Sequence, residues 1–389
     1  MTIPVLLVCT ATRVFEAARV PRALARAGFE VTLLAPRGTL AEKSRFVSRI
    51  GHTPDDATPS QWVFAFAATV KATSPRLVVP GDDHALRLLQ MLVLSPSEFI
   101  QPALQRELAS LVSESLGAPE HYRTSVDKTL LAPAAKALGV PMPPHAIVTD
   151  PAEAEAFAAD RGYPIVLQRG HSSAGDGVEL CSDRHQLARA FAALKRSADG
   201  GFQEPAGDRL LAQAYVAGPA QSYPAAAWKG ALLAGYAGVR VVGGPDPKAP
   251  PTVNRYRYDA RLRDLTSRLA VGFGISGFFS PEFVVDNRTG EPYLLDINRQ
   301  VVREAHGGGD IGVDHWLALH AALQGTAAAT RADLDEGEEH VTVHFPQEWL
   351  RDPQSHWLRE CPVDVPWDDP ELIEAMLEPL QGARITATI

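Results

Sequence analysis

The segment EPYLLDINRQ, residues 291–300, carries a carboxylate and a carboxamide two residues apart at the end of an apolar strand. In an extended strand, residues i and i+2 project from the same face, so Asp296 and Asn298 would lie side by side while Ile297 points the other way. Two oxygen-bearing side chains would therefore face one spot. Oxygen ligands of this kind are the ones that hard divalent cations prefer.

The preceding strand carries a third oxygen-bearing side chain, Glu282, and NRTG at 287–290 is typical of a turn that joins two strands as a hairpin. We expect this hairpin to bring Glu282 to the side of Asp296 and Asn298. Because Mg²⁺ uses few protein carboxylates and takes its other ligands from water and nucleotide phosphates, the three side chains predict a site for Mg²⁺ bound to a polyphosphate, with Mn²⁺ as the alternative ion. The competing interpretation is that Glu282 and Asp296 are solvated charges at a sheet edge.

The elements that would position this site begin with a predicted N-terminal α/β domain, residues 1–118, built on a parallel sheet. Its loops Thr10–Arg13 and Gly81–Asp83 follow strands, and ligands bind at that edge of parallel sheets. The alternative for Asp82 or Asp83 is that it caps the next helix. The first loop lacks the G-x-G-x-x-G turn that a dehydrogenase needs. The predicted elements are strands at 4–9, 29–35 and 76–80 and helices at 14–27 and from His84.

The middle of the chain, residues 119–330, is predicted to form a second domain of mixed α+β type, and residues 331–389 a small appended α+β segment. A glycine-rich stretch at 169–180 follows one strand of the middle domain. The predicted helices of this domain lie at 125–139, 184–196 and 259–272, and its predicted strands at 163–168, 209–216, 231–242 and 278–285.

Composition narrows the class of protein. The 389 residues include 46% hydrophobic and 21% charged residues, which supply a normal core, and the net charge of −9 argues against nucleic acid or an anionic membrane as a partner. The three cysteines have no metal-ligand spacing and fit a reducing compartment, so we expect a cytoplasmic protein. No stretch approaches the length of a membrane span.

Five segments, taken in the order in which they occur along the chain, make the sequence resemble the ATP-grasp superfamily, of the type that ligates carboxylates to amines. The resemblance implies a Rossmann-like pre-ATP-grasp domain followed by two subdomains with ATP between them. It implies that Lys128 in SVDKTLLAPAAKALGVPMPP contacts phosphate and that Glu282, Asp296 and Asn298 bind Mg²⁺. Further implied nucleotide-binding residues, in YPIVLQRGHSSAGDGV and LLAQAYVAG, are Gln168, Ser173, Gly175, Gly177, Gln213, Ala214, Tyr215 and Val216.

The sequence departs from the family pattern at three places. Gln168 stands where the family usually has a lysine, and Ala214 stands where the hinge usually carries a glutamate. The acidic ribose ligand is replaced by Ala220 or Gln221. A neutral carboxamide cannot offset phosphate charge, so these changes predict a weaker or altered nucleotide site.

The resemblance implies an ADP-forming ligase that makes an acylphosphate from a small carboxylate and passes the acyl group to an amine, for which we favour an amino acid or small peptide. We expect Arg240 and Arg299 to stabilise γ-phosphate and acylphosphate charge, because guanidinium binds such oxygens bidentately. We expect Arg303 to hold the substrate carboxylate or to approach the amine. His306 is a further candidate near the substrates. A regulatory nucleotide-binding protein, a kinase and an AMP-forming ligase are the alternatives, and a homodimer is left open.

Overall fold

The N-terminal sheet contains four parallel strands in the order β3–β2–β1–β4. The parallel pairing of β1 with β2 confirms the predicted βαβ unit. One face of the sheet packs on α1 and the other on α2, α3 and α4. The strands are β1 (Ile3–Val8), β2 (Phe29–Pro36), β3 (Val47–Thr53) and β4 (Leu77–Pro80); the helices are α1 (Phe15–Arg26), α2 (Pro59–Thr73), α3 (Asp83–Leu94) and α4 (Pro102–Leu116), with the 3-10 turn η1 at Leu40–Lys43. This computed structural model describes residues 2–95, 100–171, 177–196, 209–244 and 250–386.

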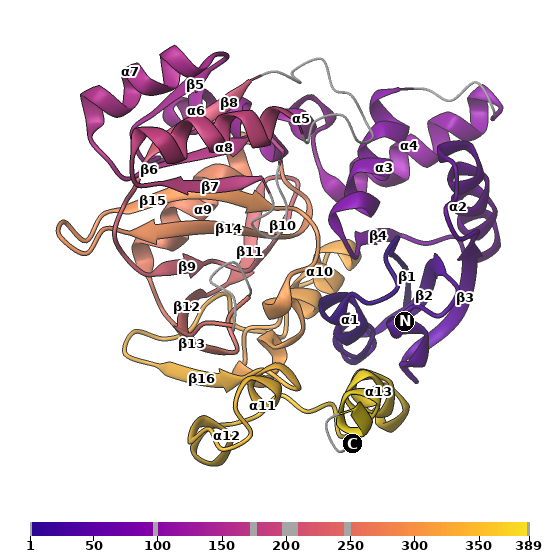
Figure 1. Ribbon diagram of the computed structural model, residues 1–389. Coiled ribbons are helices and arrows are strands. Elements are labelled where there is room, and N and C mark those ends of the chain that lie inside the picture. The colour runs from indigo at the N-terminus through magenta and orange to yellow at the C-terminus, as the bar shows by residue number, and fades with distance from the viewer. Residues whose placement is uncertain (1, 96–99, 172–176, 197–208, 245–249, 387–389) are drawn as a thin grey trace.

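A small antiparallel sheet follows, in the order β5–β8–β6–β7, with α7 and α8 packed on it. In Figure 1 this sheet lies above the large sheet, and α5 lies at its side toward the N-terminal part. Its strands are β5 (His145–Val148), β6 (Ile165–Arg169), β7 (Val178–Cys181) and β8 (Leu210–Ala214). The helices of this region are α5 (Tyr122–Val126), α6 (Lys128–Ala137), α7 (Pro151–Arg161) and α8 (Arg184–Arg196), preceded by the 3-10 turn η2 (Pro119–His121).

The large sheet has eight strands, in the order β11–β10–β14–β9–β12–β13–β16 with β15 paired to β14. Helices α6 and α9 (Ala260–Gly272) cover its core through leucines such as Leu131 and Leu269. The strands are β9 (Ala220–Ser222), β10 (Ala225–Trp228), β11 (Ala231–Gly235), β12 (Ala237–Val242), β13 (Val253–Arg257), β14 (Gly277–Val285), β15 (Pro292–Asn298) and β16 (Glu339–Val343). The predicted boundaries at 118 and 330 fall outside the helices and strands and stay predictions.

The strand predicted at 231–242 is two strands rather than one. Strand β11 pairs with β10, whereas β12 pairs with β9 and β13, so the chain leaves one partner and joins others at Tyr236. The Tyr236 ring is fully buried, and its hydroxyl donates to the Glu304 carbonyl oxygen at 3.2 Å. The largely apolar run does not reveal such a break, because the residues on both sides of Tyr236, Ala234 and Ala237, are equally buried.

The C-terminal segment is part of the large sheet and also contacts the N-terminal sheet's helices. Strand β16 pairs antiparallel with β13, with Val343 opposite Val253. The two last helices and α11 follow it, and Figure 1 shows α13 beside the N-terminal part. The remaining elements are η4 (Arg303–His306), η5 (Gly308–Ile311), α10 (His315–Gln324), α11 (Gln347–Arg351), α12 (Trp357–Glu360) and α13 (Pro370–Thr386).

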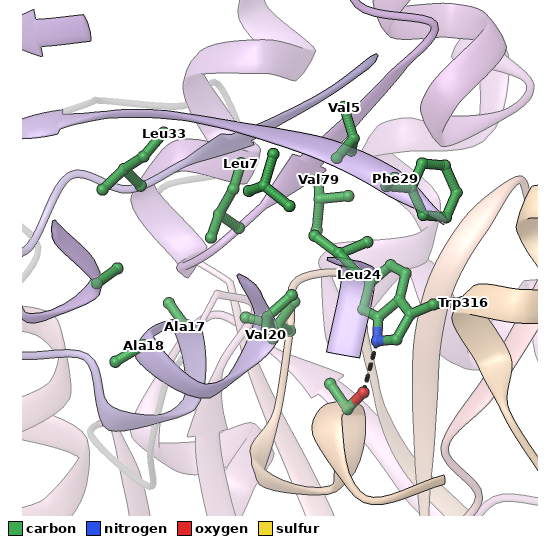
Figure 2. Packing of buried hydrophobic residues seen from close by; sticks show 14 of the residues in the cluster. Val5, Leu7, Ala17, Ala18, Val20, Leu24, Phe29, Leu33, Val79 and Trp316 are labelled. Carbon is green, nitrogen blue, oxygen red and sulfur yellow. Dashed lines mark hydrogen bonds between the residues drawn. The ribbon is translucent and has the colours of Figure 1, made fainter. Parts of the chain in front are cut away.

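One hydrophobic cluster joins α10 to the N-terminal sheet. Trp316 is 1% exposed and packs in the same cluster as Leu24 and Phe29 (Figure 2). Its indole Nε1 donates to the Ala305 carbonyl oxygen at 2.7 Å, so the one polar atom of the ring is satisfied. This shared core fixes η4, which borders the site described below, against α1. Within the described ranges, no helix is long and apolar enough to cross a membrane.

Candidate active site

A cleft of about 780 Å³ lies between the small and large sheets and reaches the N-terminal helices. Its walls come from β6, β7 and β8 on one side and from β14, β15 and η4 on the other, with α1 and α3 at the N-terminal end. A volume of this size is typical of ligand sites between structural layers. Apolar side chains on the small-sheet side include Val166 and Val178, and across from them lie Val284 and Leu295.

The hairpin β14–β15 brings the three predicted metal-binding residues together in this cleft. Glu282 lies opposite Asp296 in the register, and Ser280 lies opposite Asn298, which confirms the predicted pairing of the two strands. The Asn298 Nδ2 donates to Glu282 Oε1 at 2.9 Å. A register irregularity after Glu282 shifts the strand there, and Gly290 in the turn has a φ of +71°, which glycine adopts without strain.

Two neighbouring carboxylates make this corner of the cleft strongly acidic. Glu282 is open to the cleft, and its pKa is raised, first by partial desolvation of the carboxyl and then by the negative charges of Asp296 and Glu304. The amide of Asn298 and the ammonium of Lys128 act in the opposite direction. Carboxylates that repel one another at short distance are stabilised when a cation binds between them.

Lys128 places an ammonium group at this acidic corner. Asp127 accepts a hydrogen bond from the Thr129 amide and so starts α6 with Lys128 at its first position. The side chain of Lys128 is 5% exposed, and its Nζ lies 2.6 Å from Asp296 Oδ2. An ion pair between residues 168 positions apart fixes α6 against β15 at the cleft.

The donor set fits a hard divalent cation held mainly by two carboxylates. Glu282 and Asp296 offer oxygens at one spot, which suits an ion that takes its other ligands from phosphates and water. Asn298 offers its amide hydrogens to Glu282, while its oxygen accepts from Gln300 Nε2 at 3.2 Å, so it would join as a ligand only after rotation of the amide. Among the described residues, no group of three or more His, Cys, Asp and Glu side chains has metal-site geometry.

The predicted hinge residues line the cleft at the end of β8. Gln213, Ala214, Tyr215 and Val216 are all wall residues. Gln168 of β6 is beside them, and its Nε2 donates to Gln213 Oε1 at 3.3 Å. Both glutamines are nearly fully buried.

The glycine-rich loop is described only at its ends. Gly177 has a φ of +79°, and its carbonyl oxygen accepts from the Arg169 amide at 3.0 Å, which closes the base of the loop between β6 and β7. A side chain at Gly177 would meet the Arg169 guanidinium, so glycine is needed there. Ser173 and Gly175 lie outside the described residues.

Two of the three predicted arginines line the cleft. Arg240 at the end of β12 is exposed there. Arg303, the first residue of η4, donates to the Pro251 carbonyl oxygen at 2.5 Å and lies 3.2 Å from Glu16 Oε1. Its guanidinium therefore lies at the N-terminal end of the cleft, in an ion pair that a substrate anion could share.

Arg299 and His306 do not reach the cleft wall, contrary to the sequence-based expectation. The Arg299 side chain is 2% exposed and donates to the Leu116 carbonyl oxygen and to Ser125 Oγ. Burial lowers its pKa to about 10. His306 is turned to Asp364, with 3.0 Å between Nε2 and Oδ2. Side chains alternate along an extended segment, so Arg299 next to Asn298 points to the opposite face.

Sequence reasoning missed two acidic residues of the cleft. Glu304 is 8% exposed, and its Oε1 accepts from Ser222 Oγ and from Asn254 Nδ2, each at 3.1 Å. Glu16 pairs with Arg303 across the same end. Neither belongs to a local motif, because their neighbours in space come from distant strands, so no signal in the sequence identified them.

For the loops at the N-terminal edge, the sequence left open whether Asp82 and Asp83 bind a ligand or cap the next helix. Asp82 caps α3 by accepting from the Ala85 amide at 2.8 Å, and its Oδ2 also accepts from the Thr10 amide at 2.6 Å. This side chain ties the two loops together and has a structural role. Asp83 lines the cleft and is 3.3 Å from Arg87.

Comparisons with known sequences match the middle of the chain. Residues 127–221 match the family described as the ATP-binding domain of the carbamoyl-phosphate synthase L chain. A D-alanine–D-alanine ligase from Ectopseudomonas mendocina (strain ymp) is 26% identical over 175 residues, which are 41% of this chain and 51% of the ligase. The large chain of a carbamoyl phosphate synthase from Rubrobacter xylanophilus is 26% identical over 204 residues, 51% of this chain and 19% of that protein. The chain thus spans about half the length of the first relative and a smaller part of the second.

Solved structures resemble the chain over most of its length. The biotin carboxylase domain of Hydrogenobacter thermophilus 2-oxoglutarate carboxylase, in complex with MgADP, ADP and bicarbonate, has a TM-score of 0.66 at 18% identity, over 88% of this chain and 74% of that one. An N5-carboxyaminoimidazole synthase from Aspergillus clavatus, in complex with ADP and 5-aminoimidazole ribonucleotide, has a TM-score of 0.63 at 14% identity. The match covers 87% of this chain and 81% of that one. At these identities the likeness shows a common fold.

Proposed function

We propose that this chain, whose residues 127–221 match the ATP-binding domain of the carbamoyl-phosphate synthase L chain, is an ADP-forming ATP-grasp ligase that joins a small carboxylic acid to an amine through an acylphosphate. The single observation that carries the proposal is the convergence of Glu282 and Asp296 with Lys128 in the cleft between the two sheets. Two carboxylates and an ammonium at one point suit a metal-bound polyphosphate.

The chain's own residues would supply binding, orientation and charge. The hinge Gln213–Val216 and the apolar pair Val166 and Val284 would hold the base, and Lys128 would place a compact positive charge near the phosphates. Arg240 and Arg303 would bind phosphate and carboxylate oxygens. Phosphoryl transfer needs mainly positioning and charge neutralisation from a protein, which is what this set offers.

The reaction has two balanced steps. A substrate carboxylate oxygen attacks the γ-phosphorus of ATP, the bond to the bridging oxygen breaks, and ADP leaves. The amine nitrogen then attacks the acyl carbon, the carbon–oxygen bond to phosphate breaks, and inorganic phosphate leaves as the nitrogen loses a proton. Glu304 and Glu16, at the N-terminal end, are suited to attract an ammonium group. Magnesium held by Glu282 and Asp296 would neutralise the β- and γ-phosphate oxygens.

The test is to incubate the protein with ATP, Mg²⁺ and pools of amino acids and other small carboxylic acids and amines, and to measure nucleotide products, phosphate and new amides by mass spectrometry. ADP, phosphate and an amide in equal amounts are the expected products. Asp296→Ala should remove them, and Glu291→Ala, on the solvent side of the same hairpin, should not.

A nucleotide-binding protein without ligase activity is the second candidate, favoured by the neutral Gln168–Gln213 pair in place of a charged side chain. It predicts that MgADP or MgATP binds while no carboxylate and amine pair releases phosphate. AMP as the product would indicate an AMP-forming ligase, and a phosphorylated acceptor without amide would indicate a kinase.

A further inference from the structure

Two buried glutamines face each other where the cleft meets the hinge. Gln168 on β6 is 5% exposed and Gln213 on β8 is 3% exposed, and both line the cleft. Gln168 Nε2 donates to Gln213 Oε1 at 3.3 Å. Among the described residues, Gln213 Nε2 is buried and has no hydrogen-bond partner. A buried amide donor without an acceptor is costly, and because this one borders the cleft it is available to a ligand atom there.

The position of the pair limits what that ligand atom is. Gln213 is the first of the hinge residues Gln213–Val216, which would contact the base in the proposed nucleotide site. Val166, the register partner of Gln213 on β6, adds an apolar surface beside it. In the proposed nucleotide site the unpaired donor would therefore lie near the edge of a purine rather than near the phosphates, which the proposed metal corner would bind.

A carboxamide differs from a carboxylate in what it can offer to a purine. Adenine presents the N7 acceptor and an amino donor at C6, whereas guanine presents the N7 acceptor and a carbonyl acceptor at the same place. A glutamate could accept from the adenine amino group but would repel the guanine carbonyl oxygen. Glutamine offers an acceptor in one orientation of its amide and a donor in the other, and the two orientations occupy the same volume.

Gln168 allows Gln213 to take either orientation. If Gln213 turns its nitrogen to the base, its oxygen still accepts the hydrogen bond from Gln168 Nε2 that is seen here. If Gln213 turns its oxygen to the base, its Nε2 can donate instead to the side-chain oxygen of Gln168, once that amide has also turned. A lysine at position 168 would permit only an oxygen toward it. The pair is uncharged as a whole and favours neither orientation by charge.

We propose that Gln213, supported by Gln168, reads the C6 position of the purine with either face of its amide, so that this protein accepts guanine as well as adenine nucleotides. This inference rests on the proposed nucleotide-binding function. It names Gln213 as the residue that sets base selectivity and Gln168 as its positioning residue.

The test measures binding of MgADP, MgGDP and MgCDP to the full chain by titration calorimetry, which requires no knowledge of the other substrates. The wild type should bind MgADP and MgGDP with affinities within about tenfold of each other and MgCDP more weakly. Gln213→Glu should lower the affinity for MgGDP relative to MgADP by about tenfold or more, because an acceptor then faces an acceptor. Gln186→Glu, on α8 packed on the same small sheet, adds the same charge away from the cleft and should leave the ratio unchanged.

The outcomes separate this inference from the proposed function. Binding of MgADP with rejection of MgGDP by about a hundredfold or more in the wild type would overturn the inference and leave the function standing. Binding of neither purine nucleotide would overturn both. Gln213→Met keeps the volume and removes both hydrogen-bonding groups, so it should weaken both purine nucleotides; undiminished binding in this variant would also contradict the role of Gln213.

Discussion

The Lys128–Asp296 ion pair joins two residues that sequence reasoning assigned to different roles, phosphate binding and metal binding. Their 2.6 Å contact, between Lys128 Nζ and Asp296 Oδ2, brings the two side chains together at one point of the cleft. Since the side chain of Lys128 is almost fully buried and that of Asp296 is about a quarter exposed, the pair is well shielded from solvent. Such a lysine also has a structural function, which must be separated from its effect on turnover.

Lys128→Gln should reduce kcat/KM for ATP by about a hundredfold or more, because one desolvated counter-charge near the phosphates is lost. Lys136→Gln, in the last turn of the same helix and exposed, should retain normal rates. Steady-state kinetics with thermal unfolding of each variant would check this. A wild-type kcat/KM in folded Lys128→Gln would refute the assignment.

Arg299 should contribute to stability rather than to catalysis. Arg299→Ala leaves the Leu116 carbonyl oxygen and Ser125 Oγ without their buried donor, which should lower the free energy of unfolding by about 3 kcal/mol. The kcat per folded molecule should remain within about threefold of wild type. Urea denaturation and active-site-normalised rates would test both statements, and a large loss of kcat with unchanged stability would restore the catalytic role.

At the scale of elements, sequence patterns predicted those strands and turns whose conformation depends on residues close together in the chain. The hairpin β14–β15 followed from the NRTG turn and from alternating side chains, and it brings Glu282, Asp296 and Asn298 close together, while their role as metal ligands stays a prediction. Strand β3 was missed because it is an edge strand with mostly exposed residues around Arg49 and therefore has little apolar signal. Arg299 follows Asn298 directly at the end of β15, so the same alternation places its side chain on the face opposite the cleft, where the expected phosphate contact had not put it.

The C-terminal segment gave the least sequence signal because its contacts are with distant residues. Asp364 accepts hydrogen bonds from His306 and His344, each at 3.0 Å, and lies 3.4 Å from Arg19 on α1. Although burial acts in the opposite direction, Arg19 and the two histidines hold the pKa of Asp364 well below its usual range. One buried carboxylate thus joins β16, η4 and α1.

Asp364→Asn should therefore loosen this junction. Removing the charge from a buried cluster of three nitrogen-bearing partners should cost about 3 kcal/mol of unfolding free energy. Hydrogen exchange should increase in α1 and in residues 339–378. Asp368→Asn, on the same segment but paired with Arg22 near the surface, should cost less than about 1 kcal/mol. Equal effects of the two changes would show that Asp364 has no special role.

At the scale of the whole molecule, the N-terminal sheet and the large sheet are joined through α10. Trp316 packs toward α1, while the preceding residue, His315, stacks on Tyr236 and meets Phe278 of the large sheet edge to face. No local pattern could predict this junction, since it depends on the order in which the strands of the large sheet are arranged.

His315 should make the stability of the junction depend on pH. Burial lowers the pKa of His315 to about 4, whereas an unfolded histidine titrates near 6.5. The folded state therefore holds the neutral imidazole, and the unfolded state binds the extra proton as pH falls below 6.5. Stability from this group is complete above that pH and declines toward pH 4, by about 2 kcal/mol between pH 7 and pH 5.

Urea denaturation at pH 7 and pH 5 would measure this decline in the wild type and in His315→Gln, whose amide can still donate to the Pro224 carbonyl oxygen that now lies 3.0 Å from His315 Nε2. The variant should lose about 2 kcal/mol less than the wild type over this interval, because it no longer differs in protonation between the folded and unfolded states. His185→Gln, exposed on α8, should keep the full decline. If His315→Gln and the wild type lose stability equally, His315 is not the group that couples this junction to pH.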